Sequence, residues 1–507
     1  MPLARSWSVA LLGVEGHLVE VEAHLAPGLP GLGLIGLPDA ALSEARDRVR
    51  AAVLTSGLDW PPQRITVGLS PATLPKAGSA FDLAIAAAIL AAAGALPAEG
   101  LAERVLVGEL GLDGRVRHVR GVLPSVLGAA RAGRGIVVVP MADAAEARLV
   151  PGLRVEPVGS LRSFVTLLRG GPADPEPPPG PVQPRSTTPE PDLADVAGQL
   201  LGRRALEISA AGGHHLYLHG PPGAGKSMLA ARLPGLLPDL DRARALEVSM
   251  VHSVAGLLPA GSPLVSRPPF RSPHHGISRA ALVGGGSIPL RPGEISAAHG
   301  GVLFLDEAPE FAPGVLDALR QPLESGFVEI ARARGCARFP ARFTLVLAAN
   351  PCPCSRAGGP DCTCTPAVRR RYLARLSGPL MDRVDLQVAL PPVGRVELLC
   401  DAGAGESTAV VRARVAAAHG SALRRLSGSP WRSNAEVPGP QLRRRFLPAA
   451  PALLALHRAF ERGALTARGY DRVLRVAWTV CDLEGRAAPA AQDVAEALLL
   501  RVPGLAS

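Results

Sequence analysis

The chain has 507 residues, a formal net charge of +10 and 47% hydrophobic residues, but only 3% aromatic residues. At about 150 residues per domain, this length predicts roughly three domains, with cores built from Ala, Leu and Val. The seven cysteines, four of them clustered, argue against a disulfide framework, and the basic charge favours a polyanionic partner such as nucleic acid.

The longest apolar run spans residues 83–96 and is too short to cross a bilayer, so it indicates a buried helix. The apolar run at 9–14 is too short for the core of a secretion signal. We therefore expect a cytoplasmic protein that does not contact membranes.

Residues 1–168 alternate strand-like and helix-like segments. The expected strands are 18–21, 65–69, 105–107 and 136–139, and the expected helices are 42–54, 80–93 and 123–132. Residues 169–191 are rich in proline, which predicts a semi-extended linker rather than a packed element.

Residues 192–394 have the pattern strand, glycine-rich turn, helix and further strands. The expected strands, 215–218, 302–305 and 345–348, are apolar runs typical of a parallel sheet. Residues 395–507 look helical, at 410–418, 453–462, 470–481 and 491–500. The sequence therefore predicts an α/β domain with a parallel sheet, followed by a helical domain.

The glycine-rich turn fits the phosphate-binding pattern G-x-x-x-x-G-K-[ST], with residues Gly220, Pro221, Pro222, Gly223, Ala224, Gly225, Lys226 and Ser227. Backbone amides of such a loop point at phosphate oxygens, and the following helix adds its positive N-terminus. Lys226 is one of two lysines in a chain with 54 Lys and Arg residues. We expect it to reach the β- and γ-phosphates of ATP, with Ser227 holding Mg²⁺.

Two further strand ends carry polar residues suited to the same chemistry. The apolar run at 302–305 ends in Asp306 and Glu307, a Walker B pattern in which Asp306 binds Mg²⁺ and Glu307 is the general base. Asn350 follows the next core strand and is one of two asparagines in the chain. An amide there can orient the attacking water and sense the γ-phosphate.

Arginines are candidates for the remaining catalytic positions. Arg383 follows Asn350 in the chain and could act in trans on the γ-phosphate of a neighbouring subunit. Arg468 begins a helical segment and could be the lid arginine, in the sensor 2 role, with Arg472 as its rival. Because arginine is abundant in this chain, neither assignment is specific without a family pattern.

These motifs, in this order, resemble the AAA+ ATPases of the magnesium-chelatase type, and more closely the ComM/YifB subfamily. The strings that carry the resemblance include FRSPHHGISRAALVGGG at 270–286, RPGEISAAHGGVLFLDEAPEF at 291–311 and FPARFTLVLAANPCPC at 339–354. The resemblance implies a hexameric ring that uses ATP and Mg²⁺, with the C-terminal helices as a lid. In this family the ring is linked to DNA branch migration during natural transformation and to other DNA processing.

The resemblance also implies a DNA-facing hairpin before Asn350, near residues 328–338. Its arginines are Arg332, Arg334 and Arg338. Guanidinium groups there would bind DNA phosphates without sequence preference. The alternative is a solvated hairpin face.

The N-terminal domain resembles the α+β fold of Lon-type proteases. Ala80 stands at the position of the Lon serine nucleophile and Leu123 at the position of its lysine, so we expect no peptidase activity. Ser79 is adjacent, and Lys76, the second lysine, has a structural or a nucleic-acid contact role that the sequence does not decide.

Four cysteines, Cys352, Cys354, Cys362 and Cys364, follow Asn350 within 13 residues. Four thiolates can close a tetrahedral zinc site, although C-x-C pairs are tighter than the usual C-x-x-C. The alternative is a set of reduced, unliganded thiols.

The sequence leaves three other functions to weigh against a DNA motor. The first is a motor subunit for metal insertion into a porphyrin, which normally lacks the Lon-like domain and the cysteine cluster. The second is a regulatory protein of the same class that acts without DNA and binds ATP as a structural ligand, and such a non-hydrolysing site has no need of the base Glu307. The third, an ATP-dependent protease, is opposed by Ala80 and Leu123.

Overall fold

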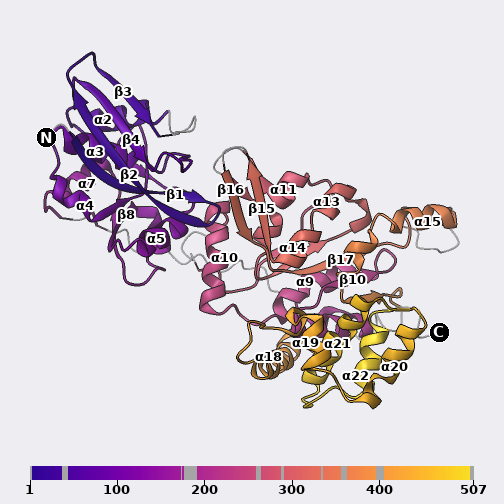
Figure 1. The fold of residues 1–507 in the computed structure, drawn as a ribbon. Coiled ribbons are helices and arrows are strands. Elements are labelled where there is room, and N and C mark those ends of the chain that lie inside the picture. The colour runs from indigo at the N-terminus through magenta and orange to yellow at the C-terminus, as the bar shows by residue number, and fades with distance from the viewer. Residues whose placement is uncertain are drawn as a thin grey trace.

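A computed structural model describes residues 3–36, 44–172, 174–175, 191–258, 264–286, 290–332, 335–354, 362–394 and 405–502. An N-terminal lobe lies at one end, the C-terminal helices lie at the other, and an α/β core lies between them (Figure 1). Most of the predicted linker, residues 173 and 176–190, lies outside the described residues. No helix in the described ranges is long and apolar enough to span a bilayer.

The N-terminal lobe is built on a mixed seven-stranded sheet in the order β3-β4-β2-β1-β5-β8-β9. Its strands are β1 (Leu3–Leu12), β2 (Glu15–Ala26), β3 (Gly31–Ile35), β4 (Arg64–Ser70), β5 (Arg104–Leu106), β8 (Ile136–Pro140) and β9 (Arg154–Val158), with the short pair β6 (Glu109–Leu110) and β7 (Val116–Arg117). Its helices are α2 (Ala45–Thr55), α3 (Asp82–Ala92), α4 (Ala98–Ala102), α5 (Val122–Arg131), α6 (Ala144–Ala147) and α7 (Leu161–Leu168). The apolar run around residue 83 is the helix α3, and every residue of α3 is buried.

The core contains a five-stranded sheet in the order β11-β14-β17-β10-β18, and all its pairings are parallel. The strands are β11 (Phe270–Arg271), β14 (Val302–Leu305), β17 (Thr344–Ala349), β10 (Leu216–His219) and β18 (Leu386–Ala389). Every residue of β14 and β17 is buried, as expected for parallel strands covered on both faces. The prediction of an α/β domain with a parallel sheet is confirmed.

Helices and two hairpins surround this sheet. The helices are α8 (Leu200–Gly212), α9 (Lys226–Leu236), α10 (Arg242–Ala255), α11 (Arg279–Val283), α12 (Glu294–Ala297), α13 (Pro313–Asp317), α14 (Arg320–Ser325), α15 (Pro366–Leu373) and α16 (Gly378–Met381). The hairpins are β12 (Gly284–Gly285) with β13 (Arg291–Pro292), and β15 (Phe327–Arg332) with β16 (Gly335–Pro340). The second hairpin lies where the family resemblance predicts one.

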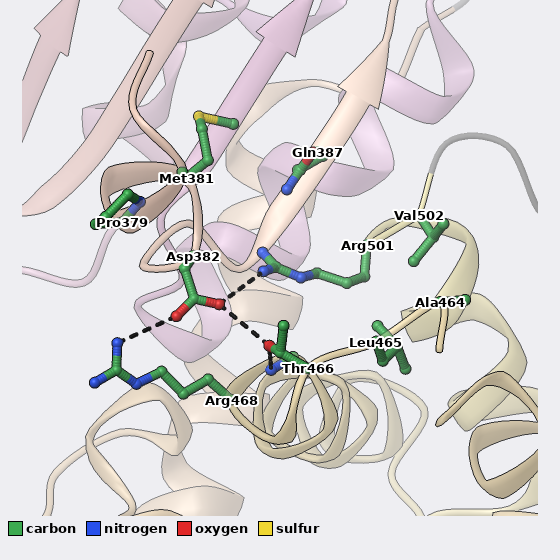
Figure 2. Close-up of a pocket in the computed structure, with 12 residues that line it drawn as sticks. Pro379, Met381, Asp382, Gln387, Ala464, Leu465, Thr466, Arg468, Arg501 and Val502 are labelled. Carbon is green, nitrogen blue, oxygen red and sulfur yellow. Dashed lines mark hydrogen bonds and ion pairs between the residues drawn. The ribbon is translucent and has the colours of Figure 1, made fainter. Parts of the chain in front are cut away.

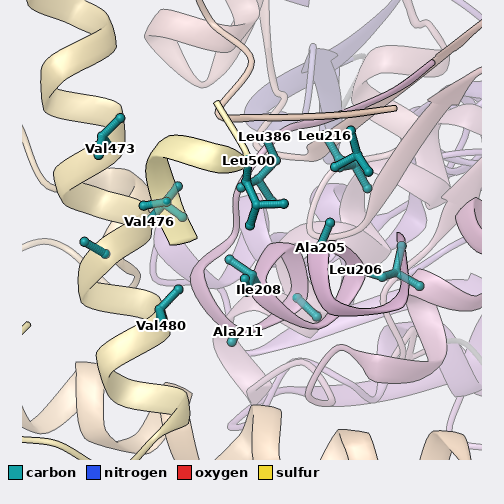
Figure 3. Close-up of a cluster of buried hydrophobic side chains, with 14 of the residues drawn as sticks. Ala205, Leu206, Ile208, Ala211, Leu216, Leu386, Val473, Val476, Val480 and Leu500 are labelled. Carbon is teal, nitrogen blue, oxygen red and sulfur yellow. The ribbon is translucent and has the colours of Figure 1, made fainter. Parts of the chain in front are cut away.

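The C-terminal part is helical, with α18 (Thr408–Arg425), α19 (Gly439–Arg444), α20 (Ala450–Glu461), α21 (Ala467–Leu483) and α22 (Ala491–Leu499). At one edge a cavity of about 590 Å³ separates these helices from the core (Figure 2). Elsewhere one apolar cluster joins the two parts, with Ile208 of α8 and Leu386 of β18 facing Val476 and Val480 of α21 (Figure 3). The helices therefore pack on the core as one hydrophobic unit.

A buried polar network holds the C-terminal helices together. Asp482 of α21 accepts hydrogen bonds from Arg425 at 2.5 and 2.7 Å and from Asn434 at 2.9 Å. Asn434 also donates to Thr479, which contacts His214 of the core at 2.7 Å. The network thus links α18 and α21 to the core.

The N-terminal lobe packs on the core at two places. The turn between β1 and β2 lies against the β15–β16 hairpin, where Gly13 has φ +66° and a Cβ atom would lie 2.7 Å from the Arg338 carbonyl oxygen. At the second place, Glu146 of the lobe accepts hydrogen bonds from Ser253 of α10 at 2.5 Å and from the Leu123 amide at 2.7 Å. Burial raises the pKa of Glu146.

The buried carboxylate of Asp482 gives a stability prediction. Asp482→Ala should reduce the opening free energy of amides in α18 and α21 by about 3–5 kcal/mol, because Arg425 loses its buried partner. Native-state hydrogen exchange measures this loss. Asp239→Ala is the matched control, because Asp239 pairs with Arg412 of α18 at 2.8 Å on an exposed surface and should cost less than about 1 kcal/mol. Equal losses in the two variants would contradict the prediction.

Candidate functional site

The ends of three neighbouring parallel strands bring the predicted nucleotide-binding residues together. Gly220 follows β10, Asp306 follows β14 and Asn350 follows β17. Because β14, β17 and β10 are parallel neighbours, their carboxyl ends lie on one edge of the sheet. Open α/β sheets bind ligands at this edge.

The loop between β10 and α9 has the geometry of a phosphate cradle. Gly223 and Gly225 have φ of +76° and +82°, and a Cβ atom on either would meet no atom within 4 Å. Gly220 instead approaches the core, where a Cβ atom would lie 2.5 Å from the Leu390 carbonyl oxygen. Helix α9 starts at Lys226, so its positive N-terminus opens on the same space.

Lys226 lies in the centre of this cradle. Its ammonium group donates to the Gly220 and Pro221 carbonyls at 2.7 and 2.8 Å and to Asn350 Oδ1 at 2.9 Å. Burial lowers the pKa of Lys226, and the nearby Asp306 and Glu307 oppose this shift. Lys226 and Asn350, both of which are expected to lie at the γ-phosphate, are therefore in direct contact.

The acidic pair faces the loop from β14. Asp306 accepts a hydrogen bond from the Ser227 hydroxyl at 2.6 Å, so the two predicted Mg²⁺ ligands are adjacent. Asp306 also accepts from the Glu307 amide at 2.9 Å. Glu307 has φ +50°, a left-handed conformation that is costly for a residue with a side chain and that is found preferentially at functional sites.

His275 joins the site from the segment that follows β11. Its Nδ1 lies 3.6 Å from Glu307 Oε2, and its ring centroid lies 4.0 Å from that of His274, with the two rings tilted by 35°. From the sequence we expect only a structural or loop role for the pair of histidines. The contact with Glu307 joins residues far apart in the chain, and no sequence pattern signals it.

The arginines lie at the other edge of the sheet. The Asp385 and Leu386 amides donate to the His215 carbonyl, so Arg383 lies near the amino ends of β10 and β18. Four strand residues at about 3.3 Å each separate the two edges by roughly 13 Å. Arg383 and Arg468 are thus on the side of the sheet that faces away from Lys226.

The three candidate arginines differ in their exposure to solvent and in their partners. Arg472 is 14% exposed and binds Asp385 at 2.5 Å and the Asp382 carbonyl at 2.7 Å, which commits it to a structural role. Arg468 is 65% exposed and contacts Asp382 at 3.3 Å. Arg383 is 12% exposed and pairs with Glu324. The geometry favours Arg468 over its rival Arg472 as the residue able to meet a phosphate.

The four cysteines converge as a tetrahedral metal site requires. All four sulfur atoms lie within 4.8 Å of one another, and those of Cys352, Cys354 and Cys362 are 3.3–3.6 Å apart. A tetrahedron with Zn–S bonds of about 2.3 Å has sulfur atoms roughly 3.8 Å apart. Arg369 donates to Cys362 Sγ at 3.3 Å, the kind of outer contact that orients a ligand. The donor set fits zinc.

The predicted DNA-facing arginines lie on the β15–β16 hairpin. Arg332 and Arg338 are exposed, and Arg338 stacks on Phe327 at 4.1 Å and pairs with Glu329 at 3.5 Å. Arg334 lies outside the described residues.

The N-terminal lobe places a different set of groups where a Lon-type dyad is expected. Ser79 hydrogen-bonds Glu109, and Lys76 is buried with its ammonium group on the Pro71 carbonyl. Burial raises the pKa of Asp82 to about 6, against the effect of its Arg48 partner. Leu123 is buried in α5. Lys76 and Ser79 thus have different partners, and the described residues of this lobe contain no hydrogen-bonded serine–lysine dyad.

Comparison with known proteins fits this architecture. Residues 192–398 match the family described as magnesium chelatase, subunit ChlI, residues 21–143 match subunit ChlI of Mg-chelatase, and residues 405–501 match the C-terminal part of that subunit. Competence protein ComM of Haemophilus influenzae is 42% identical over 501 residues, which cover 98% of this chain and 97% of ComM. The chain belongs to the magnesium-chelatase family of AAA+ ATPases.

Full-length relatives in the same family include YifB of Escherichia coli, 43% identical over 97% of this chain and 96% of YifB. An uncharacterized protein of Mycobacterium tuberculosis is 54% identical over 99% of both chains. A Lon protease of Mycolicibacterium smegmatis is 29% identical over 149 residues, 28% of this chain and 19% of the protease. The likeness to Lon is therefore partial.

The contact between His275 and Glu307 gives a prediction for turnover. His275→Ala should lower the ATP hydrolysis rate about tenfold, because Glu307 loses the neighbour that fixes its carboxylate, a change of about 1.4 kcal/mol in the barrier. ATP affinity, measured by titration with a fluorescent analogue, should stay unchanged.

His274→Ala is the matched control for this variant. His274 accepts a hydrogen bond from the Gly276 amide at 3.1 Å, whereas the pairing with Glu307 belongs to His275. An equal loss of turnover in both variants, or none in His275→Ala, would refute the role of His275.

Proposed function

We propose that this chain is an ATP-hydrolysing motor that works as a ring, hexameric in the family, and acts on DNA. The observation that carries the proposal is the division of the site between two edges of one sheet. Lys226, Asp306, Glu307 and Asn350 lie at the carboxyl edge, and Arg383 and Arg468 lie at the amino edge. In a head-to-tail ring, the amino edge of one subunit meets the carboxyl edge of the next.

Each residue has a role in this proposed site. The loop amides and Lys226 bind the β- and γ-phosphates of ATP, and Ser227 and Asp306 hold Mg²⁺, which offsets phosphate charge when bound. Glu307 takes a proton from the attacking water, and Asn350 orients that water. Arg383 and Arg468 of the adjacent subunit stabilise charge on the transferring phosphoryl group. To do so, Arg383 must leave its partner Glu324 and bind the phosphate instead.

DNA is the proposed partner of the ring. The chain has a net charge of +10, and its hairpin presents Arg332, Arg338 and, in the sequence, Arg334. The name of the Haemophilus relative, competence protein ComM, supports a role in DNA uptake or recombination. Contacts from guanidinium groups to phosphate would make binding independent of sequence and sensitive to salt.

DNA dependence separates this proposal from the chelatase-type alternative. ATP hydrolysis by the wild-type protein should rise when branched or single-stranded DNA is added, because DNA engages the ring. Glu307→Gln should bind ATP and DNA but hydrolyse at least 100-fold more slowly, because it lacks the base. A phosphate-release assay at two salt concentrations measures both effects. Turnover that DNA leaves unchanged, together with no DNA binding, would eliminate the DNA motor.

We also propose that Cys352, Cys354, Cys362 and Cys364 hold a structural zinc ion. The spacing of their sulfur atoms and the hydrogen bond from Arg369 support this assignment. Reduced thiols of this kind suit the cytoplasm, where we place the protein.

Metal analysis tests the zinc site directly. The purified chain should contain about one zinc ion, and Cys354→Ser should lose it, because three thiolates bind zinc more weakly than four. Cys336→Ser is the control, since Cys336 lies on the exposed face of the hairpin and should leave the zinc content unchanged. A wild-type chain without stoichiometric zinc after metal-free purification in reductant, and with unchanged stability on chelation, would end the proposal.

A further inference from the structure

Asp382 stands at the joint between the core and the C-terminal helices. It follows α16, on the wall of the cavity between the two parts (Figure 2). Its carboxylate lies 3.3 Å from Arg468 Nη1, 3.3 Å from the Thr466 hydroxyl and 3.9 Å from Arg501 Nη2. All three partners come from the C-terminal helices, so one core carboxylate faces one cluster of groups across the joint.

Because a cavity lies between the core and the C-terminal helices here, polar contacts such as those of Asp382 have to fix their relative position. The space of about 590 Å³ is lined on the core side by Pro379 and Met381 and on the helical side by Leu465 and Val502 (Figure 2). Apolar side chains that stand around a cavity do not fix each other's positions as a packed core does. At this edge the position of α21 depends on polar contacts, namely those of the Asp382 carboxylate and those of Arg472 with the Asp382 carbonyl and with Asp385.

Two arginines of the C-terminal part, Arg472 of α21 and Arg501 after α22, also hold this joint. Arg472 donates to the Asp382 carbonyl at 2.7 Å and pairs with the buried Asp385 at 2.5 Å. Arg501, which is nearly buried, donates to the Val384 carbonyl. The backbone of residues 382–385 is thus fixed, and the Asp382 carboxylate is a rigid reference point for Arg468.

Asp382 is also the direct chain neighbour of Arg383. Asp382, which contacts Arg468, is therefore followed directly by Arg383, the other proposed catalytic arginine. Arg383 belongs to the core and Arg468 to the C-terminal helices, 85 positions later in the chain. Because Arg472 anchors α21 one helical turn away, the Asp382 carboxylate fixes where the exposed Arg468 side chain lies relative to Arg383.

We propose that Asp382 is a positioning residue that sets Arg468 relative to Arg383, so that both guanidinium groups reach one γ-phosphate of a neighbouring subunit. The inference rests on the proposed ring function. Asp382 does not touch the phosphate itself. It acts on the active site of the next subunit, and its loss leaves the ATP site of its own chain intact.

Subunit mixing tests this inference in the full-length protein. Asp382→Asn keeps the size of the side chain but removes its charge, and alone it should hydrolyse ATP about tenfold more slowly than wild type with unchanged affinity for an ATP analogue. Glu307→Gln lacks the base but keeps Asp382 and both arginines. When the two variants are mixed before ring assembly, each intact Glu307 can pair with intact arginines from the other variant. The mixture should then turn over ATP several-fold faster than the mean of the separate preparations.

Two controls accompany the mixing experiment. Arg383→Ala mixed with Glu307→Gln should recover activity in the same way, which tests the shared site itself. Asp239→Asn also removes an acid that pairs with the C-terminal helices, through Arg412 at 2.8 Å, but away from the arginines. It should retain wild-type turnover.

The outcomes separate this inference from the proposed ring function. Without recovery in the Arg383→Ala mixture, the shared site fails and this inference fails with it. With recovery for Arg383→Ala but not for Asp382→Asn, Asp382 acts within its own subunit and the inference alone is overturned. Should Asp382→Asn not fold, Asp382→Glu, which keeps the charge on a longer arm, replaces it in the mixture. Wild-type turnover by Asp382→Glu and by Asp382→Asn would also overturn the inference.

Discussion

The common direction of β10, β14 and β17 is the constraint on which the rest of this structure depends. Parallel strands give a sheet two chemically different edges. The carboxyl ends lead into the glycine loop, the acidic pair and Asn350, and Lys226 ties the first and last of these together at 2.9 Å. At the amino ends lie residues 382–385, which include Arg383 and bind Arg468 and Arg472 through their two aspartates. In the proposed ring, each subunit would contribute opposite halves of two ATP sites.

The C-terminal helices are attached to the core in two different ways. Apolar packing and the buried network around Asp482 hold α18 and α21 over most of the contact area. Near the cavity, polar contacts to Asp382 take the place of close packing. Buried networks lose much stability when one partner is removed, whereas exposed contacts exchange partners at little cost. The exposed pairing of Arg468 with Asp382 is therefore the part of this contact that exchanges partners most readily.

The phosphate loop and the acidic pair could be predicted because each is a short contiguous pattern with its own chemistry. The strands that lead into them were predicted for the same reason, as apolar runs of four to six residues. Strand β1 was missed because it lies at the sheet centre between β2 and β5, and its sequence lacks a clean alternation. The contacts of His275 with Glu307 and of Asp382 with Thr466 were not predicted, since the chain folds back over 32 and 84 residues to make them.

The turn at Gly13 helps to hold the N-terminal lobe against the hairpin of the core. The covalent connection of the lobe to the core passes through the proline-rich sequence of residues 169–191. The lobe also contacts the core directly, through the glycine turn on the hairpin, the pairing of Glu146 with Ser253, and the packing of Leu246 and Met250 of α10 on the apolar cluster of the lobe. A load on the β15–β16 hairpin is thus passed at Arg338 to a seven-stranded sheet, which resists bending of this part of the hairpin.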